Sequence, residues 1–128
     1  MAIKKEVREK VWLKCDKHCA YCGTEIEYKQ MQVDHIEAHW HNYTEEQCVK
    51  YGLKKGVCEF DNYNPACVRC NRWKGTMNLE TFRNEIQMQL ERLKRDSNQY
   101  RMAFDYGMIN EDHKPIVFFF EREKILNK

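Results

Sequence analysis

The sequence lacks the two kinds of apolar segment that direct a chain to a membrane. No apolar run is long enough to cross a bilayer, since the cluster "IVFFF" at 116–120 has only the length of a strand. The N-terminal "MAIKKEVREK" lacks the apolar middle region of a secretory signal. We therefore expect a cytoplasmic protein that makes no contact with a membrane.

Internal repeats and low-complexity segments are also absent, so one domain over residues 1–128 is the expectation for this length. A mean hydropathy of −0.87 and 33% charged residues indicate a very soluble chain. The 42% of hydrophobic residues can form a small core. Seven cysteines in a reducing compartment should not form a disulfide framework, and their odd number argues the same way.

Net charge is small, at +2, but it is unevenly distributed. Residues 1–18 carry +3, residues 19–66 carry −4, residues 67–101 carry +4 and residues 102–128 carry −1. Basic segments beside an acidic middle suit a polyanionic partner that also needs a metal ion. Charge alone leaves a second interpretation open, in which the basic residues are the solvated faces of two helices.

Hydrophobic periodicity and capping residues predict a mixed chain of helices and short strands. Helices are predicted over 3–15, from Thr44 to Gly52, from a start near Cys67–Asn71 to Gly75, over 79–93 and over 98–107. One strand is predicted over 30–36 and another after Pro115, where "PIVFFF" has high β-propensity. Residues 54–66 are predicted to be a loop. The apolar stripe of the helix over 79–93 is predicted to be core, and its members are Leu79, Phe82, Ile86, Leu90 and Leu93.

Two C-x-x-C pairs are the strongest chemical signal in the sequence. Cys19 and Cys22 stand in "HCAYCG", and Cys67 and Cys70 stand in "PACVRCNRWKG". Thiolate sulfur favours Zn²⁺ over hard cations, and four thiolates fill a tetrahedral shell, leaving no open position for catalysis. We therefore predict a structural zinc site. The 44 residues between the pairs exceed the spacing of simple zinc ribbons, so a further substructure must lie between them.

The three remaining cysteines are Cys15, Cys48 and Cys58. Together with His18, His39 and His41 they could form a second metal site, although their spacing fits no known pattern well. The alternative is that they are small buried residues.

The motifs around and between the cysteine pairs resemble those of HNH endonucleases. "CAYCG", "VDHI", "DN" placed five residues before the second C-x-x-C, and "CNRWK" occur in the order typical of this family. The resemblance covers residues 19–75, about half of the chain. This family is found in colicin nucleases, phage homing enzymes and the nuclease domain of RNA-guided effectors.

The resemblance implies a small α+β fold: a ββα-metal core, here residues 15–78, with a structural zinc clamp at its base. The N-terminal helix over 3–15 and a helical and strand extension over 79–128 would flank it. The implied activity is hydrolysis of DNA phosphodiester bonds to 5′-phosphate and 3′-hydroxyl ends, by nicking or double-strand cleavage. The implied setting is a bacterium or a phage-infected host, and the implied partner is DNA, expected to be double-stranded, without a small-molecule cofactor.

The resemblance also implies roles for individual residues. His35 would be the general base, and Asn62 would orient this base and pin its loop. Asp34 and Asn71 would hold a catalytic Mg²⁺ or Mn²⁺, since carboxylate and amide oxygens are hard donors. The basic residues that would contact DNA phosphates are Arg69, Arg72 and Lys74, with help from Lys4, Lys5, Arg8 and the helix after Gly75.

The sequence departs from the family pattern in two places. The usual Pro and Gly-Gly after the Asp-His pair are missing, and Asn64 is a rival for the role of Asn62. Two other interpretations remain. The chain could be a catalytically inactive, zinc-stapled DNA-binding module, although such a module has no need for the set of Asp34, His35, Asn62 and Asn71. It could also be a zinc-knuckle protein–protein adaptor, which would leave the basic segment 67–101 unexplained.

Overall fold

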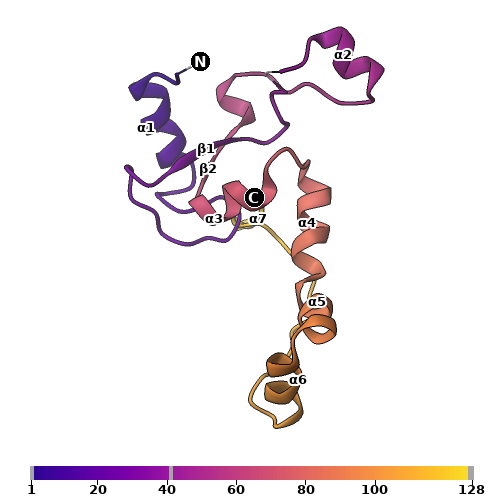
Figure 1. Cartoon of the computed structure of the whole chain (residues 1–128). Helices are drawn as coiled ribbons and strands as arrows, with labels where there is room; N and C mark the ends of the chain where they lie inside the picture. The colour runs from indigo at the N-terminus through magenta and orange to yellow at the C-terminus, as the bar shows by residue number, and fades with distance from the viewer. Residues whose placement is uncertain (1, 41, 127–128) are drawn as a thin grey trace. The chain divides into compact units, whose positions relative to one another are not determined.

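The structure is a computed structural model that describes the backbone of residues 2–40 and 42–126 and the side chains through residue 122 (Figure 1). It is a small α+β structure, with seven α-helices and one two-stranded antiparallel sheet in this described part. The α+β prediction is confirmed. The chain forms two compact units, the first made of Met1–Leu79 and Phe118–Lys128 and the second of Glu80–Val117. That the chain is one domain stays a prediction.

The sheet of the first unit pairs β1 (Gln32–His35) with β2 (Tyr63–Ala66), and His35 lies opposite Tyr63 at one end. The strand predicted over 30–36 is confirmed, but the loop predicted for residues 54–66 is wrong over its last four residues. Asn and Pro disfavour strands, yet all four β2 residues are buried, and tertiary burial overrides local propensity. Pro65 is tolerated because each strand of a two-stranded sheet is an edge strand.

Helix α1 (Lys5–Lys14) covers the hydrophobic core of the first unit, as the apolar spacing over 3–15 predicts. Val11 is fully buried in this core with Met31, Ile26 and Tyr63. The Trp12 indole donates a hydrogen bond to the Ile26 carbonyl at 2.9 Å, and the Lys14 ammonium donates to the Tyr63 carbonyl at 2.6 Å. These contacts attach the helix to β2 and to the turn before β1.

Two further predicted helices of the first unit are confirmed with their caps. In α2 (Glu45–Lys50), Thr44 and Gln47 form the expected capping box, and Gly52 follows with φ of +71°. In α3 (Val68–Lys74), Cys67 is the N-cap residue and Gly75 ends the helix with φ of +51°. A short 3₁₀ turn, η1 (Phe60–Asn62), leads into β2.

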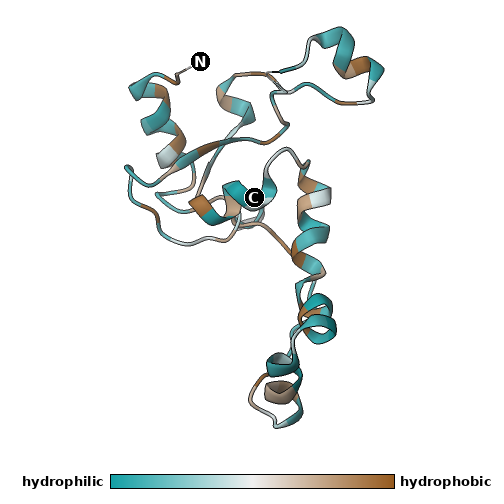
Figure 2. Cartoon of the chain, in the orientation of Figure 1, coloured by the Kyte–Doolittle hydropathy of each residue, from teal (hydrophilic) through white to brown (hydrophobic). Residues whose placement is uncertain are grey.

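The single amphipathic helix predicted over 79–93 is two helices, α4 (Leu79–Gln87) and α5 (Gln89–Asp96), interrupted at Met88. Phe82 of the predicted apolar stripe is buried, but Leu93 is 41% exposed, so the stripe is core only in part. Helix α5 is coloured mainly as hydrophilic in Figure 2. Helix α6 (Asn98–Asp105) follows, with Ser97 as its N-cap, and confirms the helix predicted over 98–107. None of the helices in the described ranges combines the length and apolar character needed to cross a bilayer.

The strand predicted after Pro115 is wrong, because residues 115–118 form no regular structure and α7 (Phe119–Leu126) begins at Phe119. Phe118 is buried against the Tyr21 ring, with centroids 5.2 Å apart. The backbone N–H groups of Phe119 and Phe120 donate to the carbonyls of Tyr21 and Ala20. The Glu121 carboxylate accepts from the Phe118 N–H at 2.9 Å, as a residue in a helical first turn can. These contacts with the turn that carries Cys19 and Cys22 override the high β-propensity of the phenylalanines.

Candidate functional site

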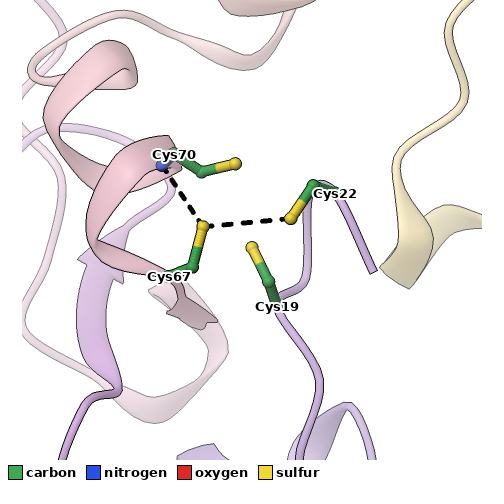
Figure 3. A group of neighbouring side chains, drawn as sticks. All are labelled: Cys19, Cys22, Cys67 and Cys70. Carbon is green, nitrogen blue, oxygen red and sulfur yellow. Dashed lines mark hydrogen bonds between the residues drawn. The ribbon is translucent and has the colours of Figure 1, made fainter. Parts of the chain in front are cut away.

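The four cysteines of the C-x-x-C pairs lie together, with their sulfur atoms all within 4.8 Å of one another. Figure 3 shows Cys19 and Cys22 on one turn, and Cys67 and Cys70 at the start of α3, gathered around one centre. Such a group could bind a structural metal such as zinc. The hydrogen bond from Cys70 lowers the pKa of the Cys19 thiol to about 4, which favours one thiolate in the group.

The first cysteine turn is shaped by its own backbone and covered by the C-terminal segment. The Gly23 N–H donates to the Cys19 carbonyl at 3.0 Å, and Gly23 has φ of +79°, which favours glycine. A Cβ at this position would lie 2.9 Å from the ring of Phe119. Gly23 therefore permits both the backbone conformation of the turn and the close packing of Phe119 against it.

The other cysteines do not form a second cluster of this kind within the described residues. Cys15 and Cys48 are buried, as one interpretation predicted, whereas Cys58 is exposed. His18 stacks on Phe119, with centroids 5.2 Å apart. His41 lies outside the described residues.

Asp34 is buried on β1 and both of its carboxylate oxygens have partners. Oδ2 accepts a hydrogen bond from the Tyr21 hydroxyl and pairs with the Lys74 ammonium at 3.1 Å, while Oδ1 has a longer contact of 3.4 Å with Lys74. Burial raises the pKa of the Asp34 carboxyl, and the Lys74 charge acts against this. Burial, followed by the Asp34 charge, raises the pKa of Tyr21, so this phenol stays a donor.

Lys74 is fully buried, and its ammonium also donates to the carbonyls of His35 at 3.0 Å and Ile36 at 3.2 Å. The prediction that Lys74 contacts a DNA phosphate is wrong in this structure, because these groups and Asp34 hold its ammonium in the interior. The last turn of α3 packs on β1, and Lys74 fixes the end of the strand that carries His35.

His35 is half-buried at the end of β1, with two aromatic side chains around its ring. The His39 ring stacks at a centroid distance of 5.5 Å, and the Tyr63 ring stands edge-on at 5.1 Å. Burial lowers the pKa of His35, and the charges of His39 and Lys74 add to this effect. The neutral imidazole, which can accept a proton, is therefore favoured at neutral pH.

A cavity of about 930 Å³ brings together three of the residues to which the sequence resemblance gave roles. Asp34 and His35 reach it from β1, and Asn71 reaches it from α3. Adjacent strand residues point to opposite faces, and the pair lines one cavity because the strand ends at His35. Cys58 and His39 also line this cavity.

Asn62 holds two loop segments together through its side-chain amide. Its amide oxygen accepts from the Glu37 N–H at 2.9 Å, and its amide nitrogen donates to the carbonyls of Glu37 at 3.0 Å and Val57 at 2.8 Å. Its rival Asn64 is fully buried, and its amide nitrogen has a 3.4 Å contact with the Tyr21 hydroxyl. The contacts of Asn62 match the loop-pinning role better than those of Asn64.

The basic residues expected to bind DNA differ in their surroundings. Arg72 is exposed on α3, and Arg69 is exposed beside Cys22, whose hydrogen bond raises the pKa of this guanidinium. Arg8 is instead half-buried and donates to the carbonyls of Tyr28 and Met31. The arginines of α4 and α5 pair with acids of their own unit: Arg83 with Glu80, Arg92 with Glu85 and Arg95 with Asp96.

The contacts of Tyr21 and Cys58 were missed by the sequence interpretation. The sequence held a signal for Tyr21, because this residue stands between Cys19 and Cys22. If one metal binds both cysteine pairs, Tyr21 is held close to the second pair. Cys58 had no comparable signal, because a single cysteine in a loop has no distinctive spacing.

No protein-family model and no curated protein matches the chain. Among solved structures, its fold is similar to part of the Type II-C Cas9 enzyme from Actinomyces naeslundii, with a TM-score of 0.50 and 24% sequence identity. The likeness covers 67% of this chain and 8% of the Cas9 chain, so it concerns a small part of that enzyme. At this identity it shows a common fold alone.

We expect one zinc ion per chain in the four-cysteine cluster. Replacement of Cys67 by serine should lower both the zinc content and the melting temperature, because a thiolate ligand is lost. Elemental analysis and thermal unfolding measure the two effects, and Cys48→Ser is the matched control for the zinc content, since this cysteine lies outside the cluster. A zinc-free preparation that is fully folded would contradict the prediction.

Lys74→Met should lower the free energy of unfolding by about 3–5 kcal/mol, because it leaves the Asp34 carboxylate buried without its ammonium partner. Chemical denaturation measures the loss. The double variant Asp34→Asn, Lys74→Met should recover part of it, since the uncompensated charge is then removed. If Lys74→Met is as stable as the parent protein and only binds DNA more weakly, the structural role of Lys74 is wrong.

Proposed function

We propose that this chain is a metal-dependent endonuclease of the HNH type, which hydrolyses DNA phosphodiester bonds to 5′-phosphate and 3′-hydroxyl ends. The observation that carries the proposal is the common cavity of Asp34, His35 and Asn71. The sequence resemblance had given these three residues their roles, and they come from two elements of the chain, β1 and α3.

His35 acts as the general base in this proposal. Its lowered pKa leaves the imidazole neutral at neutral pH, so it can take a proton from water as the water attacks phosphorus. Lys74 and Asn62 act as positioning residues. The Lys74 ammonium donates to the His35 carbonyl. The Asn62 amide bonds the backbone of Glu37, two residues after His35.

The donor set of the cavity fits a hard divalent cation. Carboxylate and amide oxygens are the ligands that Mg²⁺ and Mn²⁺ prefer, and the contact of Asp34 Oδ1 with Lys74 is long, at 3.4 Å. Asp34 and Asn71 would hold the ion, with water and phosphate oxygens completing its shell. A bound cation would supply charge neutralisation at the phosphate and at the leaving oxygen.

The proposed substrate is DNA, expected to be double-stranded. Arg72 and Arg69 are exposed on α3, the helix that also carries Asn71, so phosphates they contact would lie close to the cavity. The fold likeness to a Cas9 enzyme agrees with the resemblance in sequence, since the nuclease domain of RNA-guided effectors is one setting in which the HNH pattern is found.

One observation favours the alternative of an inactive DNA-binding module. The Lys74 ammonium is paired with Asp34 and would compete with a metal ion for this carboxylate. A binding module would keep the cysteine cluster and the exposed arginines, but it would not cleave DNA strands, with or without a divalent cation.

Cleavage of supercoiled plasmid with Mg²⁺, with Mn²⁺ or with EDTA separates the two functions. We expect nicked or linear product with either cation and none with EDTA. His35→Ala should reduce the rate by at least about a hundredfold, the scale of a lost general base, while zinc content and DNA affinity stay unchanged. His113→Ala is the matched control, because this histidine is exposed in the second unit.

Cleavage by purified His35→Ala at the parent rate would contradict the assignment of the base. DNA binding without cleavage under all three metal conditions would favour the inactive module.

A further inference from the structure

Cys58 lies between two histidines at the wall of the cavity. Its sulfur is 3.5 Å from Nε2 of His35 and 3.4 Å from Nδ1 of His39, both within hydrogen-bonding distance for a thiol. The three side chains come from the end of β1, from the segment that follows it and from the loop before η1. No role of the proposed nuclease mechanism uses this thiol.

The loop that carries Cys58 is held against the segment of His39 by specific contacts. The Asn62 amide bonds Glu37 on one side and Val57 on the other. The Gly56 N–H donates to the Ala38 carbonyl at 2.8 Å, and a Cβ on Gly56 would lie 1.9 Å from the Glu37 carbonyl oxygen. Only glycine permits this close approach, so the position of Cys58 opposite the two histidines is fixed by the backbone.

Within the part of the chain that the structure describes, the remaining contacts of the His35 ring do not distinguish its two nitrogens. His39 stacks on its face, and Tyr63 meets it edge-on, which together restrict the plane of the ring. A flip of the ring within that plane would exchange nitrogen and carbon positions without changing these apolar contacts. A directional hydrogen bond at one nitrogen therefore has to select the orientation and the tautomer.

We propose that Cys58 is a positioning residue that fixes the tautomer of His35. Nε2–H of His35 donates to the Cys58 sulfur, and the Cys58 S–H donates to Nδ1 of His39. The lone pair of His35 is then at Nδ1. The assignment of Nδ1 of His35 as the base rests on the proposed function, whereas the assignment of the tautomer does not.

The arrangement also suits the proton transfer. When Nδ1 of His35 takes a proton from water, the ring becomes an imidazolium with hydrogens on both nitrogens, and hydroxide remains to attack phosphorus. Nε2–H donates to sulfur before and after this step, so the ring does not need to turn. Loss of the thiol would leave Nε2 without this acceptor, and both tautomers would be populated.

Nitrogen-15 NMR of the imidazole rings tests the inference without any cleavage assay. Long-range proton–nitrogen spectra should show His35 of the parent protein with its hydrogen at Nε2. In Cys58→Ala the His35 nitrogens should shift towards values averaged over both tautomers, while His113 gives the same signals in both proteins as an internal control. If the His35 tautomer is Nδ1–H, or does not respond to Cys58→Ala, the inference is overturned.

Kinetics add a second readout in the full chain with its metals. Cys58→Ala should lower kcat for plasmid cleavage by about tenfold or more and leave KM unchanged, since a misplaced base acts only in the chemical step. Cys58→Ser should restore most of the loss, because a hydroxyl can donate and accept as the thiol does. A serine variant as slow as the alanine variant, or a loss confined to KM, would contradict the positioning role. If the parent protein does not cleave DNA, the proposed function fails while the NMR result still decides the tautomer.

Discussion

The buried ammonium of Lys74 is the contact on which the candidate site depends. It joins the last turn of α3 to the end of β1, through the Asp34 carboxylate and the carbonyls of His35 and Ile36. A buried lysine without partners would be strongly destabilising, and these acceptors offset the loss of hydration. Because the same ammonium holds both elements, His35 on β1 and Asn71 on α3 reach one cavity.

The other end of α3 is attached through the cysteine cluster. Cys67 and Cys70 meet the turn of Cys19 and Cys22, and Tyr21 within that turn donates its hydroxyl hydrogen to Asp34. The cluster and the cavity are therefore linked by one side chain. A metal in the cluster would fix the start of α3 while Lys74 fixes its end, which would give the short β1–β2–α3 assembly a rigidity that its small core alone does not supply.

The sequence predicted those parts of the fold that depend on local patterns. The capping box at Thr44, the helix from Cys67 to Gly75 and the grouping of four cysteines all follow from spacing and residue type. Strand β2 and helix α7 could not be predicted in this way, because burial of Asn64 and Pro65 and the contacts of Phe118 with Tyr21 override propensity. Lys74 was placed on the correct helix, but a DNA phosphate was predicted as its partner and the structure shows Asp34. The sequence shows that a residue is charged, but not whether a buried carboxylate lies next to it.

Paramagnetic NMR with Mn²⁺ tests whether β1 and α3 present one cation site. We expect that Mn²⁺, added to protein with a filled cysteine cluster, broadens first the side-chain amide of Asn71 and the ring signals of His35. Asn71→Ala should weaken this effect, because an oxygen donor is lost. Broadening centred on the exposed acids Glu45 and Glu46 of α2, with Asn71 and His35 unaffected, would contradict this expectation.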